Sequence, residues 1–270
     1  MRWRVLLLVF GLVAACKRGG SAAPRQDCAI LFGSPTADTG LTADQCRPLC
    51  ACNGAVFQPP VYDAAFMQSL VDDWLLQSAP PLTVDPYTQP VPAADPPGTI
   101  CAVVPGDAGA HPRPYSLVTY PSLDAATAAG AHPTHWGRCG VCSTLTNLAV
   151  YMRYDDLGKP VRNCGFAASS GDGGDGDLAC LLGLGFDLPC AQIWAYNTAH
   201  TRSVCLQTCL DHFADYYNQP DGTLNPCLQC DEDQSGPVFK AVAGRTRRNS
   251  GLPNAICRPC SEVQPLVHAY

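Results

Sequence analysis

The chain has 270 residues and carries 23 acidic against 17 basic residues, a formal net charge of −6. A surface with this charge argues against nucleic acid as a partner. The chain also lacks a Gly-x-Ser-x-Gly elbow, a phosphate-binding glycine loop and a His-Glu-x-x-His motif, which argues against the familiar enzyme classes that use them. Its 17 cysteines are costly in a reducing cytosol and typical of an exported, disulfide-linked protein.

The first fifteen residues have the pattern of a signal peptide. Arg2 and Arg4 form a positive start, and an apolar run of eleven residues follows from Val5 to Ala15. A membrane-spanning helix needs about 20 apolar residues, so this run is too short to be a permanent anchor. We therefore expect residues 1–15 to be removed after export.

The end of this run, Leu12-Val13-Ala14-Ala15-Cys16, resembles the lipobox of bacterial lipoproteins. The resemblance implies a diacylglyceryl thioether and an N-acyl group such as palmitate on Cys16, and hence a membrane as partner through the lipid anchor. The alternative is an ordinary secretory signal cut beside an incidental Cys16. Residues 16–27 have the composition of a flexible tether, and Lys17 after the cysteine favours an outer-membrane position in the cell envelope.

Once Cys16 is set aside, sixteen of the 17 cysteines remain, an even number that permits eight disulfides. Without Arg2 and Arg4, 15 of the 17 basic residues face 23 acidic ones, a mature charge of −8. The leading interpretation therefore needs no cofactor, with zinc or copper as the alternative.

Proline usage predicts two folded parts. Residues 28–77 form a small module whose cysteines, four in number, could make two bridges, and its end, Asp63–Leu76, places Phe66, Leu70 and Trp74 at helical spacing. Residues 78–98 hold seven prolines and predict a semi-rigid linker of polyproline II type. Residues 99–270 form the larger cysteine-rich domain. The expected fold class is an α-rich, disulfide-stapled α+β fold.

Within the larger domain, Tyr115–Tyr120 alternates like a strand, and Ser122–Ala129 is rich in alanine like a short helix. A further helix should begin at a Ser143 cap and end at Gly158. Later helices are expected at 177–184, 188–199 and 203–217. Cys205 and Cys209 lie one turn apart, so we expect them to bond to other segments rather than to each other. The aromatic residues of this region are more typical of core than of a pocket: Trp194, Tyr196, Tyr216 and Tyr217.

The segment from His132 to Cys142 allows three interpretations. Disulfides from Cys139 and Cys142 to other cysteines are favoured, because such frameworks dominate exported cysteine-rich chains. The local order of strand, helix, Cys-x-x-Cys and helix resembles a thioredoxin-like site, in which Cys139 would attack a substrate disulfide and Cys142 would resolve it. Pro133 and the lack of a tryptophan directly before Cys139 depart from that family. Thirdly, His132, His135, Cys139 and Cys142 would suit tetrahedral zinc or copper.

A second metal alternative is the pair of motifs Cys227-x2-Cys230 and Cys257-x2-Cys260, which would form a zinc ribbon in a reducing compartment. With metal or with disulfides, we expect the two motifs to approach each other. Two acidic loops, 171–177 and 231–236, offer carboxylates for Ca²⁺, but Val242 stands where the second would need a bidentate glutamate, so both are interpreted as solvated turns.

Arg245, Arg247 and Arg248 stand close together in an otherwise acidic domain. They either bind an anion or pair internally with the carboxylates of Asp231, Glu232 and Asp233, and we favour the internal pairing.

The run from His135 to the C-terminus also resembles uncharacterised cysteine-rich exported proteins of bacteria and algae, through three segments: Cys139–Ser143, Asn225–Glu232 and Gly244–Gly251. This resemblance implies one structural unit and no particular activity. The sequence thus predicts a membrane-anchored lipoprotein with a disulfide-rich binding or structural domain for an unknown protein or small-molecule ligand. Thiol-disulfide exchange and metal binding are the alternatives.

Overall fold

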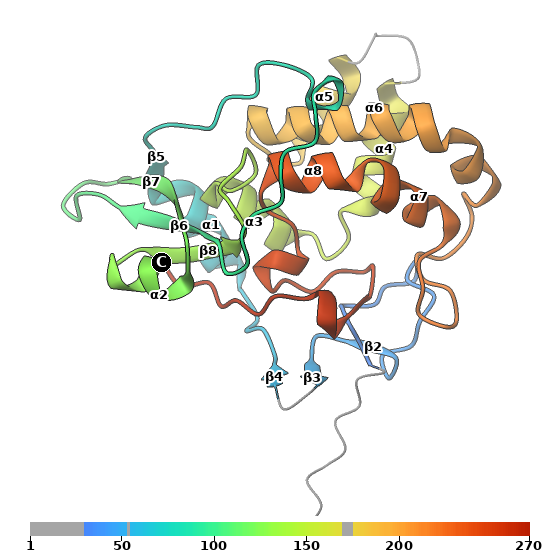
Figure 1. Cartoon of the computed structure of the whole chain (residues 1–270), viewed down its shortest axis with the longest axis horizontal. Helices are drawn as coiled ribbons and strands as arrows, with labels where there is room; N and C mark the ends of the chain where they lie inside the picture. The colour runs from blue at the N-terminus through green and yellow to red at the C-terminus, as the bar shows by residue number, and fades with distance from the viewer. Residues whose placement is uncertain (1–29, 53–54, 169–174) are drawn as a thin grey trace, which may run out of the picture.

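The computed structural model of the chain describes residues 30–52, 55–168 and 175–270 (Figure 1). Several predicted features lie outside these residues: the signal peptide, the lipobox with Cys16, the tether, Cys28 and most of the acidic loop at 171–177. In the described part, helices, small sheets and seven disulfides make a disulfide-stapled α+β fold. None of the described helices is long and apolar enough to cross a membrane.

The largest sheet has the strand order β5-β7-β6-β8 and is formed by Trp74–Leu76, Arg113–Tyr120, Ile100–Pro105 and His132–Trp136. Strand β6 is antiparallel to both neighbours, and β5 runs parallel to β7. Strand β7 confirms the predicted strand at 115–120. Strand β8 contains Pro133, which cannot donate a ladder hydrogen bond; it lies at the edge of the sheet, beside a register shift between Cys101 and Ala102.

Two smaller sheets lie apart from it, and their strands β2, β3 and β4 are seen along the lower edge of Figure 1. Strand β1 (Leu31–Phe32) pairs in parallel with β2 (Cys46–Arg47) and antiparallel with β9 (Arg258–Pro259). Strands β3 (Cys50–Cys52) and β4 (Ala55–Phe57) form an antiparallel pair. The chain's early strands therefore lie against its last strand.

The first helices follow their local sequence closely. Helix α1 (Ala64–Asp72) is capped by Asp63, and α2 (Leu123–Ala128) is capped by Ser122; both helices lie within segments predicted to be helical. The prediction that the first helix continues to Leu76 was wrong, because the three residues from Trp74 pair with β7 instead. Helix α3 (Leu145–Arg153) begins at a Thr144 cap rather than at Ser143.

The later helices form the other half of the molecule: α4 (Gly158–Ala168), α5 (Asp175–Gly183), α6 (Leu188–Asp211), α7 (Pro226–Gln234) and α8 (Gly236–Ala243). Helix α6 joins the predicted helices at 188–199 and 203–217 without a break, but it ends at Asp211, short of the predicted end at Tyr217. Short 3-10 turns lie at Pro86–Thr88 (η1), Arg248–Ser250 (η2) and Cys260–Glu262 (η3).

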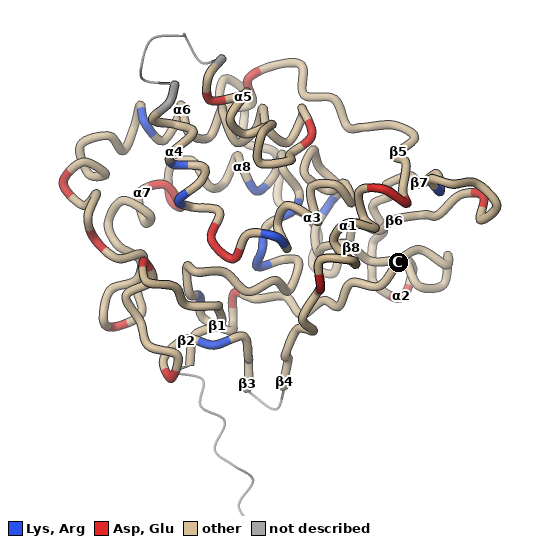
Figure 2. The backbone as a smooth tube through the Cα atoms, turned by 180° about the vertical axis from the view of Figure 1, so that it is seen from behind, with Lys and Arg blue, Asp and Glu red and all other residues tan. Residues whose placement is uncertain are grey.

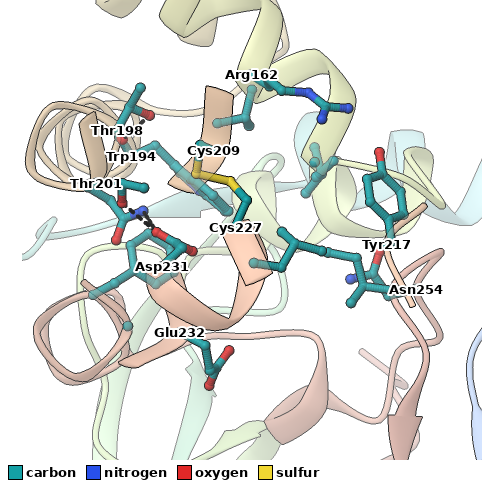
Figure 3. A pocket seen from close by; sticks show the side chains of 18 of the residues that line it. Arg162, Trp194, Thr198, Thr201, Cys209, Tyr217, Cys227, Asp231, Glu232 and Asn254 are labelled. Atoms are coloured by element: carbon teal, nitrogen blue, oxygen red, sulfur yellow. Dashed lines mark hydrogen bonds between the residues drawn. A yellow bond between two sulfur atoms is a disulfide. The ribbon is translucent and has the colours of Figure 1, made fainter. Parts of the chain in front are cut away.

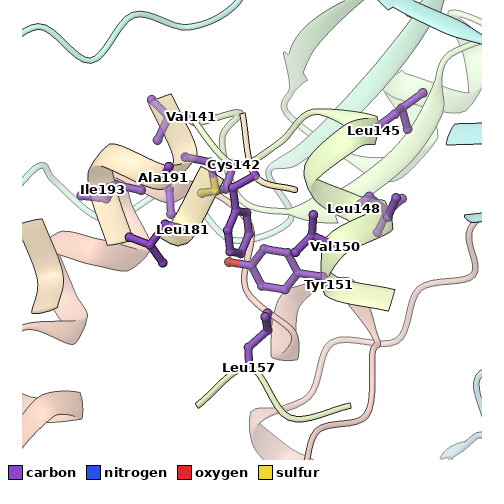
Figure 4. Packing of buried hydrophobic residues seen from close by; sticks show 14 of the residues in the cluster. Val141, Cys142, Leu145, Leu148, Val150, Tyr151, Leu157, Leu181, Ala191 and Ile193 are labelled. Carbon is purple, nitrogen blue, oxygen red and sulfur yellow. A yellow bond between two sulfur atoms is a disulfide. The ribbon is translucent and has the colours of Figure 1, made fainter. Parts of the chain in front are cut away.

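The main hydrophobic core lies where α3 meets α5 and α6. The Tyr151 ring occupies its middle, beside Leu157 and below Cys142, with Leu181 and Ile193 on the other side (Figure 4). All of these side chains are buried. Asp187 links the two helix starts that bound this core, because it caps α6 at the Cys190 amide and accepts hydrogen bonds from Thr144 and Asn147 of the α3 start, both at 2.8 Å.

The described part of the chain contains seven disulfides, Cys46–Cys257, Cys50–Cys260, Cys101–Cys139, Cys142–Cys190, Cys164–Cys180, Cys205–Cys230 and Cys209–Cys227. The prediction for Cys205 and Cys209 is confirmed, since both bond to α7. Cys46 and Cys50 were expected to form disulfides within the 28–77 module. Instead both bond to cysteines of the C-terminal segment, because β1 pairs with β9 there.

The proline-rich segment 78–98 is fixed to the helices rather than free of them. The Tyr87 hydroxyl donates to Asn197 Oδ1 at 2.6 Å and to the Ser235 carbonyl at 3.0 Å, and its ring stacks on His200. Asp95 forms an ion pair with Arg138. Helix α1 in turn packs against α3. The described parts of the predicted module and of the larger domain are therefore joined by side-chain packing and by two disulfides.

Candidate functional site

Cys139 and Cys142 belong to two different disulfides. Cys139 is bonded to Cys101 of β6, and Cys142 is bonded to Cys190 of α6. Thiol-disulfide exchange at a Cys-x-x-Cys motif needs the two cysteines to bond to each other or to be free thiols. The favoured interpretation, in which both bond to other segments, is the arrangement present here.

His135 is fully buried and serves the fold. Its Nε2 lies 2.6 Å from Ser143 Oγ and its Nδ1 lies 2.9 Å from the Trp136 carbonyl. Burial, reinforced by the Arg245 charge, holds the pKa of His135 well below its usual value. His132 lies beside the Tyr270 ring. No group of three or more histidines, cysteines or acids in the described ranges could hold a metal ion, so the predicted set with Cys139 and Cys142 is not assembled there.

The cysteines of the motifs at Cys227–Cys230 and Cys257–Cys260 bond to different parts of the chain. The first pair bonds to Cys209 and Cys205 of α6, and the second bonds to Cys46 and Cys50 of the early strands. The two motifs therefore share neither a disulfide nor a metal site among the described residues, although Arg258 of the second motif pairs with Glu232, two residues after the first. Helix α7 carries the first motif along α6, while β9 carries the second to β1.

The acidic segment 231–236 is also not a solvated turn. It forms the end of α7 and the start of α8. Asp231 accepts hydrogen bonds from Thr201 and Asn197 of α6. Burial raises the pKa of Asp231, and these hydrogen bonds oppose that rise. Ser235 is fully buried.

The three neighbouring arginines have three different environments. Arg245 is fully buried, and its guanidinium donates to the Cys142, Thr134 and Ser143 carbonyls and to two hydroxyls. It is therefore a structural cation and is not available to an outside anion. Arg248 pairs with Glu232 and Glu262, which confirms internal pairing for this residue. Arg247 has no carboxylate within ion-pair distance among the described residues.

Arg247 belongs to the wall of a cavity of about 380 Å³. Helices α4, α6, α7 and α8 and the segment from Thr246 to Val263 surround this space (Figure 3). Most of the wall is apolar, with contributions from Val161, Leu206, Leu210, Phe213, Leu228, Phe239, Leu252 and Ile256. The volume lies at the lower end of the range for small-molecule sites, which are typically apolar with a few polar groups.

Four residues of this wall hold buried polar atoms that have no hydrogen-bond partner within the described chain: Tyr151 Oη, Trp194 Nε1, Arg247 Nε and Nη2, and Asn254 Oδ1. The indole N–H of Trp194 lies near enough to the Tyr151 hydroxyl to lower its pKa, but the pair lies outside normal hydrogen-bond geometry. Buried polar groups are nearly always paired, so this cluster of exceptions makes the cavity the candidate binding site.

The wall is also strongly basic for an acidic chain. Its six basic side chains are Arg162, Arg202, Lys240, Arg247, Arg248 and Arg258, and its two acidic ones are Asp231 and Glu232. Figure 2 shows basic positions near α4 and in the middle of the molecule, with many acidic positions around its edge. Glu232 is already engaged by Lys240, Arg248 and Arg258.

Sequence reasoning found part of this site. The aromatic residues Trp194 and Tyr217 were considered for a pocket and assigned to the core, yet both line the cavity. Arg247 was considered as an anion ligand only together with its two neighbours. The rest of the wall comes from helices distant in sequence and carries no motif.

A model of a family of unknown function, DUF8771, matches residues 175–266. This segment runs from α5 to η3 and contributes three of the four helices around the cavity. No curated protein and no solved structure matches the chain. The similarity therefore adds no activity, and the function has to be argued from the site.

Proposed function

We propose that the protein is an exported, lipid-anchored binding protein that holds a small, largely apolar molecule between α4, α6, α7 and α8. The observation that carries this proposal is the cavity of about 380 Å³ with its apolar wall and its cluster of unpartnered polar groups. Disulfides from Cys205 and Cys209 to α7 fix two of its walls against each other, which favours a preformed site over one assembled on binding.

The anchor and the location rest on sequence features. Arg2, Arg4, the apolar run to Ala15 and the lipobox ending at Cys16 together indicate export and acylation. The disulfides support an oxidising compartment independently, because such bonds are rare in a reducing cytosol. A tether at residues 16–27 would hold the folded part away from the membrane, in the cell envelope.

The anchor is tested by fractionation and mass spectrometry of the full chain expressed with its own N-terminus in a bacterium. We expect the protein in the membrane fraction and an N-terminal peptide that begins at an acylated Cys16. Recovery of an unacylated chain in the soluble fraction would refute the lipid anchor and leave the binding proposal standing.

Binding is tested by native mass spectrometry of the full chain released from detergent micelles, with 1-decanol and decanoate as probes. We expect one molecule of probe per chain. Leu228→Trp, which fills the cavity, should weaken binding at least tenfold, whereas Leu182→Trp, on an exposed face outside the wall, should leave it unchanged. Equal loss in both variants, or no binding to the wild-type chain, would refute the cavity as a binding site.

A further inference from the structure

We infer that the molecule bound in this cavity is a single-chain amphiphile with one negatively charged head group, which Arg247 and Arg162 attract. This inference rests on the proposed binding function and specifies the chemistry of the ligand. It follows from three features of the wall: a buried cation without a counter-ion, a second cation without a carboxylate partner, and a shortage of free carboxylates.

Arg247 is 8% exposed and forms one hydrogen bond, from Nη1 to the Pro253 carbonyl at 2.7 Å. Its Nε and Nη2 groups have no acceptor within the described residues. Burial lowers the pKa of Arg247 to about 10, against the attraction of Tyr151, Asp155 and Asp156, so the side chain stays charged at neutral pH. The guanidinium also lies 5.9 Å from the Tyr151 ring centroid, but no carboxylate neutralises it. A buried charge without a counter-ion is unfavourable, and an anion in the adjoining cavity would offset that cost.

None of the nearby carboxylates forms an ion pair with Arg247, although Asp155 and Asp156 lie close enough to raise its pKa. Asp156 accepts hydrogen bonds from the Tyr217 hydroxyl and from the Gly158 amide, and it lies outside ion-pair distance of Arg247. In the wall itself, Glu232 faces three basic side chains, and Asp231 faces α6. The described chain thus leaves the counter-charge of Arg247 to a ligand.

Arg162 supplies a second cation on the α4 side of the cavity (Figure 3). It has no carboxylate within ion-pair distance among the described residues, and its guanidinium lies 5.6 Å from the Phe213 ring centroid and 5.9 Å from that of Tyr217. Asn254 adds a further polar group, and because its amide can be turned over, it can donate as well as accept a hydrogen bond.

The apolar part of the ligand would lie among Val161, Leu206, Phe213 and Leu228. The cavity is small for a site of this kind, which favours one alkyl chain over the two chains of a membrane phospholipid. A free carboxylate and a single-chain phosphate ester share the inferred chemistry, so the test includes a probe of each kind.

The experiment measures dissociation constants of decanoate, decyl phosphate and 1-decanol for the full chain at pH 7.5, by native mass spectrometry. Replacing Arg247 by Met should raise the ratio of the decanoate constant to the decanol constant about tenfold or more, as expected when a hydrogen bond to a charged group is lost. Arg162→Met should raise the same ratio by a smaller factor. Arg138→Met, which removes an arginine outside the cavity, should leave it unchanged.

The outcomes separate this inference from the proposed function. If no probe binds to the wild-type chain, the binding function itself fails. If the three probes bind and both arginine variants leave the ratio unchanged, the cavity binds apolar molecules and the inference of an anionic head group is wrong. A stronger effect of Arg247→Met on decyl phosphate than on decanoate would assign the head group to a phosphate ester.

Discussion

Glu232 is the most heavily paired carboxylate in the wall of the cavity. It accepts from Lys240 of the next helix, from Arg248 at 2.6 Å and from Arg258 at 2.9 Å, and it thereby joins α7, α8, η2 and β9. Burial alone would raise the pKa of Glu232, but the three basic side chains outweigh it and hold the pKa at about 2. The Glu232 carboxylate therefore binds a proton less readily in the folded state than in the unfolded chain.

We predict that Glu232→Gln lowers the free energy of unfolding by about 3 kcal/mol at pH 7, because it leaves partly buried cations without a counter-charge. The stabilisation by Glu232 is complete above pH 4.5 and is lost as the pH falls towards 2, so the difference between the two proteins should shrink over that interval. Urea denaturation between pH 7 and pH 3 measures it. Asp233→Asn, on the exposed neighbour, is the control, and a difference that is constant with pH would contradict the assignment.

At the scale of elements, Asp187 connects the starts of two helices. One oxygen accepts from the Cys190 amide at the start of α6, and the other accepts from Thr144 and Asn147 at the start of α3. The Cys142–Cys190 disulfide lies between the same two helix starts. A single side chain and a single disulfide thus fix the angle at which α3 and α6 enter the core.

Asp187→Ala should therefore cost more than loss of an ordinary cap. We expect a decrease in unfolding free energy of about 2 kcal/mol or more, against about 1 kcal/mol for Asp63→Ala, which removes only the exposed cap of α1. Thermal and urea denaturation of both variants under non-reducing conditions provide the comparison. Equal losses would show that the bonds to Thr144 and Asn147 contribute little.

The helices and strands that could be predicted from the sequence are those whose conformation depends on a few neighbouring residues. Ser122 followed by alanines specifies α2, and the alternation from Tyr115 specifies β7, because capping and strand alternation act over a few residues. Trp74 could be placed on a helix by spacing, but its pairing with Arg113 decides its conformation, and that partner is 39 residues away. Strand β8 was missed because Pro133 is tolerated only at an edge, and an edge is a property of the whole sheet.

The candidate site was harder to predict for a related reason. An even number of cysteines indicates disulfides but not their pairing, so the positions of α6 and α7 relative to each other could not be derived. The cavity wall depends on that pairing and on α4 and α8 closing around it. Arg247 differs from Arg245 and Arg248 only in its surroundings, and no spacing rule distinguishes the three residues.

At the scale of the whole molecule, two disulfides act in parallel. Cys46–Cys257 and Cys50–Cys260 join the same two regions of the chain, with sequence separations of 211 and 210 residues. Either bond alone closes nearly the same loop, so the entropy of the unfolded chain is restricted almost as much by one as by both.

The two bonds should therefore be redundant. Replacing Cys46 and Cys257 by alanine, or Cys50 and Cys260, should each lower the free energy of unfolding by only about 1 kcal/mol, mainly through lost packing. Replacing all four should lower it by about 4 to 5 kcal/mol, since the long loop is then open and the other disulfides shorten it only in part. Urea denaturation without reductant gives the three values. If the fourfold replacement costs no more than the sum of the two double ones, the bonds are not redundant.

The two parallel disulfides also determine what happens when a protease cuts the chain. The turn at 106–112 is exposed, and a cut there, or anywhere between Cys50 and Cys257, divides the chain into two pieces that remain covalently joined through the paired bonds. Such a nicked molecule would migrate as one band on a non-reducing gel and as two after reduction. A protein exposed to secreted proteases would in this way survive a broken backbone as a single particle, and its cavity would stay attached to whatever holds its N-terminal segment.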